Sequence, residues 1–159
     1  MRVRKLIMQK KSEQSDTGWR DGPIGPKFTG GLYKKSLNIG PAWKWRSAVA
    51  TDGEKEYILL CRVNEQKDNW KAWLILSTES GASVVSRFED HGNHPGIHIH
   101  AHCERSGIED GPTSIGGLIR IPAAASRQRS TRRRATTPEI FWRLAADHFR
   151  ITFVQGTLF

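Results

Sequence analysis

The sequence predicts an α+β fold: a curved antiparallel sheet of about five to six strands, with one C-terminal helix packed on it. Short apolar runs follow one another between residues 43 and 103 with brief connections, which is typical of an antiparallel meander. A single segment with helical spacing of apolar residues follows near the C-terminus. The 159 residues, 37% of them hydrophobic, suffice for one modest core.

Six segments have the composition of strands. The Asp52-Gly53 pair separates the first two and indicates a hairpin, because both central residues of a type I′ turn need positive φ. A polar loop separates the second from the third, and Pro95 and Gly96 indicate a turn before the fifth. The predicted strands are Trp43–Ala50, Glu56–Val63, Trp70–Ser77, Ser83–Phe88, Ile97–Cys103 and a short one at Leu118–Ile121.

One helix is predicted after residue 136. Thr136 is the expected N-cap, and Glu139 three residues later completes a capping box, with Pro138 tolerated in the first turn. Arg150–Val154 is expected to return as a last strand. The residues that recur at helical spacing, and so should face the core, are Phe141, Leu144, Ala145 and His148.

Two segments of the chain differ in composition from the predicted strands and helix. Residues 1–40 are polar, rich in Gly and Lys, and are expected to form a flexible basic N-terminal arm. Residues 41–159 are expected to form a single α+β domain. Within it, residues 123–137 (AAASRQRSTRRRATT in the sequence) are predicted to be a mobile Arg-rich loop because they carry almost no apolar side chains.

The charge balance points to an anionic partner. The formal net charge is +9, from 25 Lys plus Arg against 16 Asp plus Glu, and such an excess attracts polyanions. We expect nucleic acid, RNA in particular, or else an acidic protein partner such as an antitoxin. No stretch approaches the apolar length of a membrane span, so we expect no membrane partner and a cytoplasmic location. The basic residues expected to bind nucleic acid are Arg62, Arg127, Arg129, Arg132, Arg133 and Arg134.

Five of the six histidines fall between residues 91 and 102. Strand side chains alternate between two faces, so His98, His100 and His102 should project from one face of their strand. Ile97 and Ile99 should then face the core on the other. Histidine titrates near neutral pH and is also the commonest metal ligand, which makes this strand the candidate centre of activity.

The first hypothesis is metal-independent RNA cleavage, by an endoribonuclease of toxin type. One group takes the 2′-hydroxyl proton, a second protonates the leaving oxygen, and a cation stabilises the charge on the phosphorane. An exposed tryptophan among Trp43, Trp45, Trp70 and Trp73 could stack an unpaired base, although at least two of them should be core. The candidate catalytic residues are His98, His100, His102, His94, Arg87 and Lys71.

The segment RFEDHGNHPGIHIHAHCE, together with a helix that ends in HFRI, resembles small prokaryotic toxin–antitoxin-type proteins of the RelE and barnase-like ribonuclease fold group. The resemblance spans residues 43–153 and rests on a short histidine-rich stretch with a proline on a late strand. It implies RNA cleavage by the histidines without a metal cofactor. The 40-residue arm and the Arg-rich loop depart from the pattern of that group.

Two alternatives remain open. In a metal site, His98 and His100 at i, i+2 would chelate zinc, iron or manganese, with Glu104 or His102 as a third ligand. This spacing is similar to the first cupin motif, but the second cupin motif is missing. The other alternative is a nucleic-acid-binding regulator without catalysis, which would bind through the Arg-rich loop.

Overall fold

The structure, a computed structural model, describes residues 3–79, 81–91, 96–102, 118–120 and 137–154. It is an α+β protein built on one sheet with the strand order β7-β6-β5-β4-β3-β2-β1-β8. All neighbouring strands are antiparallel except β1 and β8, which run parallel. The elements are α1 (Val3–Met8), β1 (Lys11–Asp16), η1 (Pro26–Thr29), β2 (Lys44–Thr51), β3 (Glu56–Asn64), β4 (Asn69–Thr78), β5 (Gly81–His91), β6 (His98–His102), β7 (Leu118–Arg120), α3 (Pro138–His148) and β8 (Ile151–Thr152).

The α+β class and the antiparallel meander from β2 to β7 are confirmed, whereas the predicted number of five to six strands is too low. The described part of the chain forms an eight-stranded sheet. The strand without a predicted counterpart is β1, which lies between β2 and β8 near one end of the sheet, whereas β8 corresponds to the strand expected at Arg150–Val154. None of the described helices is long and apolar enough to span a membrane.

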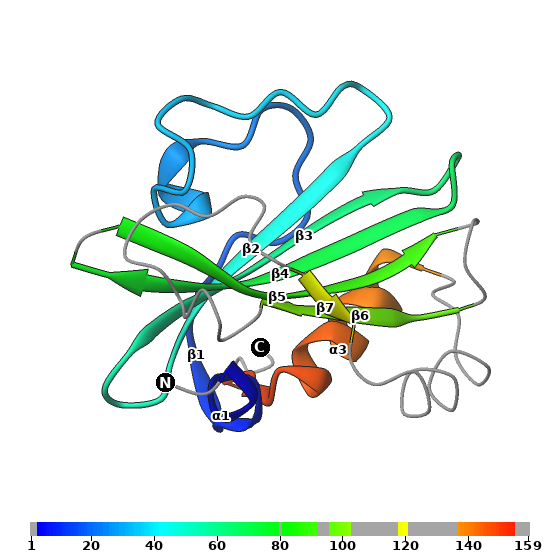
Figure 1. Cartoon of the computed structure of the whole chain (residues 1–159). Helices are drawn as coiled ribbons and strands as arrows, with labels where there is room; N and C mark the ends of the chain where they lie inside the picture. Colours follow the sequence, from blue (N-terminus) through cyan, green and yellow to red (C-terminus); the bar gives the residue numbers. More distant parts are fainter. Residues whose placement is uncertain (1–2, 80, 92–95, 103–117, 121–136, 155–159) are drawn as a thin grey trace.

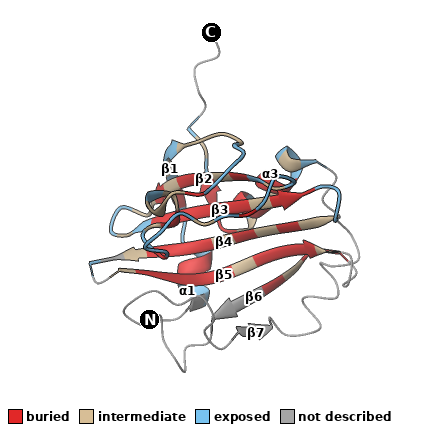
Figure 2. Cartoon of the chain, turned by 90° about the horizontal axis from the view of Figure 1, so that it is seen from above, coloured by how far each residue is buried: buried red, intermediate tan, exposed pale blue. Residues whose placement is uncertain are grey.

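The sheet has an apolar cluster on each face. Helices α1 and α3 cover one face (Figure 1), which we call the helical face, where Phe141 and Trp142 are buried in one cluster with Leu59 and Leu74. The segment around η1 covers part of the opposite face, where Ile24 joins a second cluster. Strands β3 and β5 are buried along most of their length (Figure 2). Central strands buried on both faces read as continuous apolar runs, which explains the EYILLC stretch of β3.

The prediction that residues 1–40 form a flexible arm is wrong for the described part of this range. Strand β1 pairs with β2 and β8, and the side chain of Lys11 at its start is 1% exposed. The Lys11 ammonium donates to the carbonyl oxygens of Ile7 (3.3 Å), Gln9 (2.8 Å) and Phe149 (2.9 Å). These bonds join the end of α1 to the end of α3, so a lysine replaces the apolar residue that a strand pattern would require.

Helix α3 begins one residue later than predicted. Its N-cap is Thr137, whose hydroxyl accepts a hydrogen bond from the Ile140 N–H at 3.2 Å. The expected N-cap, Thr136, lies outside the described residues, and Glu139 pairs with Arg46 of β2 at 2.9 Å. Phe141 and Ala145 are buried as predicted. The last strand is shorter than predicted, at Ile151–Thr152.

The turn between β2 and β3 is not of type I′, because Asp52 does not have a positive φ; Gly53 has a φ of 97°. The Asp52 carboxylate accepts the backbone N–H groups of Glu54 (2.9 Å) and Lys55 (2.7 Å). The hairpin is therefore confirmed, and its turn is stabilised by an aspartate side chain rather than by a second positive φ.

Strand β5 extends three residues beyond the predicted end at Phe88. Its pairing with β4 shifts at Leu74/Ile75, where Val85 is the extra residue of a β-bulge. Beyond the bulge, Phe88 faces the helical core, and its neighbours Arg87 and Glu89 therefore face the opposite side of the sheet. The extension to His91 creates the candidate site described next.

Candidate functional site

The register of four strands aligns polar residues in one row. Arg62 of β3 lies opposite Lys71 of β4, Lys71 lies opposite Glu89 of β5, and Glu89 lies opposite His98 of β6. Residues that are directly opposite in neighbouring strands project from the same face of a sheet. We call this set the polar row. It lies on the face away from α1 and α3, since neighbouring residues such as Ile99 pack in the helical core.

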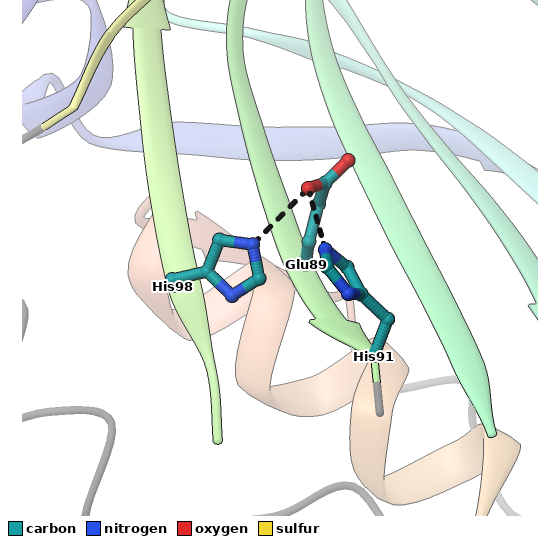
Figure 3. A group of neighbouring side chains, drawn as sticks. All are labelled: Glu89, His91 and His98. Carbon is teal, nitrogen blue, oxygen red and sulfur yellow. Dashed lines mark ion pairs between the residues drawn. The ribbon is translucent and has the colours of Figure 1, made fainter. Parts of the chain in front are cut away.

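Two imidazoles point at a single carboxylate oxygen at the β6 end of the polar row (Figure 3). The Nε2 atom of His98 lies 3.2 Å from Glu89 Oε2, and the Nε2 atom of His91 lies 3.6 Å from the same oxygen. The side chain of Glu89 is 3% exposed, whereas those of His98 and His91 are 13% and 20% exposed. We call these three residues the Glu-His-His cluster. Solvent can therefore approach it from the imidazole side.

The other groups around the cluster orient it. Arg87, also on β5, has its Nε atom 2.5 Å from Oε1, the second oxygen of Glu89. The Nδ1 atom of His98 lies 3.3 Å from the carbonyl oxygen of Gly96. A carbonyl oxygen can only accept, so a hydrogen bond here needs the tautomer or charge state with a proton on Nδ1; in the neutral form of that kind, Nε2 carries the lone pair that can bind a cation.

The distances suit a metal ion. Ligand atoms about 2.0–2.2 Å from a tetrahedral ion lie about 3.3–3.6 Å from one another, close to the two nitrogen–oxygen distances of the cluster. The three candidate ligand atoms all lie within 4.8 Å of one another. A histidine ligand commonly donates its other ring N–H to a backbone carbonyl, and the Nδ1 atom of His98 is placed to do this toward Gly96. Without an ion, the same contacts require an N–H on each Nε2 that faces Glu89, which either a neutral tautomer or an imidazolium supplies.

The polar row continues away from the Glu-His-His cluster with two basic residues, Lys71 and Arg62. Lys71 is half-buried and forms no ion pair with any residue that the structure describes. Arg62 lies with its guanidinium carbon 4.9 Å from the ring centre of Trp43 and 5.7 Å from that of Trp73. Burial lowers the pKa of Arg62 below its ordinary value, although the group stays charged at neutral pH. This face of the sheet therefore combines a candidate metal centre with positive charge and aromatic surface.

The structure brings together some of the residues that the sequence singled out. His98 and Arg87 both contact Glu89, and Lys71 lies opposite it. His100 and His102 belong to β6, and His100 pairs with Arg87 in the register, but their side chains lie outside the described residues. The following also lie outside the described residues: His94, Glu104, Arg127, Arg129, Arg132, Arg133 and Arg134.

The predicted alternation of the histidine strand is confirmed where it is described. Ile97 and Ile99 are buried in the helical core, and His98 projects from the other face. The sequence reasoning missed Glu89 as a site residue and gave His91 no role. A signal was present: Arg87, Glu89 and His91 alternate with a period of two, which places them on one face once the strand continues past Phe88.

Comparison of the chain with protein-family models, with curated proteins and with solved structures found no match. The geometry and chemistry of the site are therefore the basis for assigning a function.

Proposed function

We propose that the Glu-His-His cluster binds a divalent metal ion and that the protein is a metal-dependent enzyme that hydrolyses phosphodiester bonds of nucleic acid. The observation that carries the proposal is the convergence of His91 Nε2 and His98 Nε2 on one oxygen of a buried Glu89. This differs from the metal site considered from the sequence, since Glu89 and His91 replace Glu104 and His100.

The ligand types favour zinc or another late transition metal. Two imidazoles and one carboxylate are a common ligand set of catalytic zinc, which keeps a fourth position for water. Magnesium and calcium prefer oxygen ligands almost throughout. The 3% exposure of Glu89 also fits a ligand better than a general base, because a general base has to reach the proton of a substrate.

The reaction follows from what such an ion does to water. An ion held by Glu89, His91 and His98 would lower the pKa of a water bound to it and so supply a hydroxide nucleophile near neutral pH. In the hydrolysis, a P–O bond to the water oxygen would form as the bond to the ester oxygen breaks, the water proton would pass to solvent, and the departing oxygen would take up a proton from solvent. Lys71, which lies next to Glu89 in the polar row, supplies positive charge near the phosphate.

Nucleic acid is the phosphodiester that the whole chain favours. The net charge of +9 attracts a polyanion, and Arg62 and Lys71 extend positive charge from the metal centre along one face.

Metal binding is the first test. Metal-free protein is prepared with a chelator and titrated with Co²⁺, whose visible absorption reports nitrogen and oxygen ligands, and with Zn²⁺ by calorimetry. We expect one ion per chain in the wild type and loss of that binding in His98→Gln. A matched control is His148→Gln, because His148 contacts the rings of Phe88 and Phe149 in the helical core instead of the cluster. Wild-type protein that binds no ion, or His98→Gln that binds as the wild type does, would refute the proposal.

Metal-free RNA cleavage is a second candidate, and the contact between His98 and Glu89 at 3.2 Å favours it as well. If His98 is protonated, this contact is an ion pair that orients an imidazolium, the form that acts as a general acid. A chelator separates the candidates when RNA is the substrate. Cleavage that persists in excess EDTA supports the metal-free mechanism, and cleavage that is lost and then restored by Zn²⁺ supports the metal centre.

A further inference from the structure

We infer that Trp43, Arg62 and Trp73 form a stacking site for an unpaired nucleobase, so that the substrate is single-stranded rather than duplex nucleic acid. The inference rests on the proposed function for the reaction, but not for the binding itself.

Four tryptophans come from β2, β4 and the residue just before β2, and they divide into two kinds. Trp45 and Trp70 are 2% and 3% exposed and fill the two cores. Trp43 and Trp73 remain half-buried at the edge of the second core. Only this second pair has ring surface left for a ligand. Both rings of the pair lie beside the Arg62 guanidinium.

Arg62 has no acidic partner in the part of the chain that the structure describes. It forms no ion pair with the described residues, and its Nε atom is buried without a hydrogen-bond partner among them. Desolvation lowers the pKa of Arg62. This is the direction expected for a buried cation whose lost contact with water is not compensated by a nearby carboxylate among the described residues. A ligand that combines a π surface with an anionic or carbonyl oxygen would supply both kinds of contact, and a nucleotide has both.

The distance between the two sites fits one strand of nucleic acid. Arg62 on β3 is two strands away from Glu89 on β5, which is about 10 Å at the usual strand spacing. Lys71 lies between them in the polar row. A base at Trp73 and a phosphate at the Glu-His-His cluster would therefore belong to the same short stretch of chain. The bases of a duplex are stacked on each other and cannot reach the tryptophans.

Binding is tested with metal-free protein, so that no oligonucleotide is hydrolysed. The probes are a fluorescent single-stranded RNA, the DNA of the same sequence, the corresponding duplex, and an abasic DNA that keeps the phosphates only. We expect the single strands to bind at least ten times more tightly than the duplex or the abasic DNA. The RNA and DNA arms show which sugar is preferred, and a failure of both to bind would overturn the inference.

Three variants test the residues. Trp73→Leu, Trp43→Leu and Arg62→Gln should each weaken binding of the preferred single strand. For the tryptophans we expect about 5- to 150-fold, which is the 1–3 kcal/mol of one stacked base converted at about 1.4 kcal/mol per tenfold. Arg143→Gln on the exposed surface of α3 removes the same charge and should change binding less than Arg62→Gln. Folding of each variant is checked by circular dichroism, and Trp43→Leu remains informative if Trp73→Leu, within β4, does not fold.

The two proposals fail in different ways. Equal affinity for single strand, duplex and abasic DNA would overturn the stacking site and leave metal binding unaffected. Unchanged affinity in the folded tryptophan variants would have the same consequence. Conversely, selective binding of single strands by a protein that takes up no metal would refute the metal centre and support the stacking site.

Discussion

Glu89 is the residue on which the candidate site depends. Its two carboxylate oxygens contact different partners, Arg87 on one side and the two imidazoles on the other. A buried carboxylate is stable only when such partners compensate for the lost water. Removing its charge would leave Arg87 without its partner in a largely buried place.

We therefore predict that Glu89→Gln lowers the free energy of unfolding of the metal-free protein by about 1–3 kcal/mol. Urea unfolding in the presence of EDTA measures this change. Glu79→Gln is the matched control, because Glu79 is exposed and should change stability by less than about 0.5 kcal/mol. Equal stability of the two variants would mean that the contacts of Glu89 do not stabilise the fold.

Lys11 predicts a pH dependence of stability. Burial lowers its pKa from 10.5 to about 8, so between these values the unfolded chain binds a proton that the folded protein does not. Stability rises with pH wherever the unfolded state binds more protons. The contribution of Lys11 to the free energy of unfolding should therefore increase as the pH rises from 8 to 10. Urea unfolding of wild type and Lys11→Met over this range measures it: the stability difference between the two proteins should change with pH, and a constant difference would contradict the prediction.

At the scale of the elements, the sequence predicted what depends on local pattern. Strands β2 to β4 and helix α3 were found within a residue or two, because alternation and helical spacing are visible in the sequence. Strand β1 was missed because its sequence, KSEQSD, is polar; its strand conformation depends on backbone pairing with β2 and β8. No local pattern contains that information.

The same reason explains what the sequence missed of the site. His98 and Arg87 could be proposed from composition and strand alternation. Glu89 could not be assigned its role while β5 was taken to end at Phe88, and the bulge at Val85 that determines which residues share a face leaves no trace in the sequence. The meeting of Glu89 with His91 and His98 is a property of the pairing between β5 and β6.

The cap of α3 gives a prediction for one element. Thr137→Ala removes the hydroxyl that accepts the Ile140 N–H and should destabilise the protein by about 1 kcal/mol. Thr137→Ser keeps the hydroxyl and serves as the control. Chemical denaturation of both variants tests this, and a loss of the same size in Thr137→Ser would show that the hydroxyl is not what stabilises the helix.

At the scale of the whole molecule, metal binding should appear as thermal stability. A ligand that binds only the folded state adds about 2.7 kcal/mol at one hundred times its dissociation constant, which for a chain of this size corresponds to roughly 5–10 °C in Tm. We predict this rise on adding Zn²⁺ to chelator-treated wild type, measured by differential scanning calorimetry. The rise should disappear in His98→Gln and persist in His148→Gln, and a similar rise in all three proteins would indicate non-specific binding.

The parallel pairing of β1 with β8 joins residues 11 and 12 to residues 151 and 152. During synthesis, β1 therefore leaves the ribosome long before β8 has been translated. The hydrogen bond from the Lys11 ammonium to the carbonyl oxygen of Phe149 can form only at that late stage as well. The meander from β2 to β5 can assemble from contacts close in sequence, whereas this end of the sheet is completed only after about 140 further residues have been translated. A nascent chain stalled before residue 149 would thus expose an unpaired edge of β1, where a chaperone or a second nascent chain could bind.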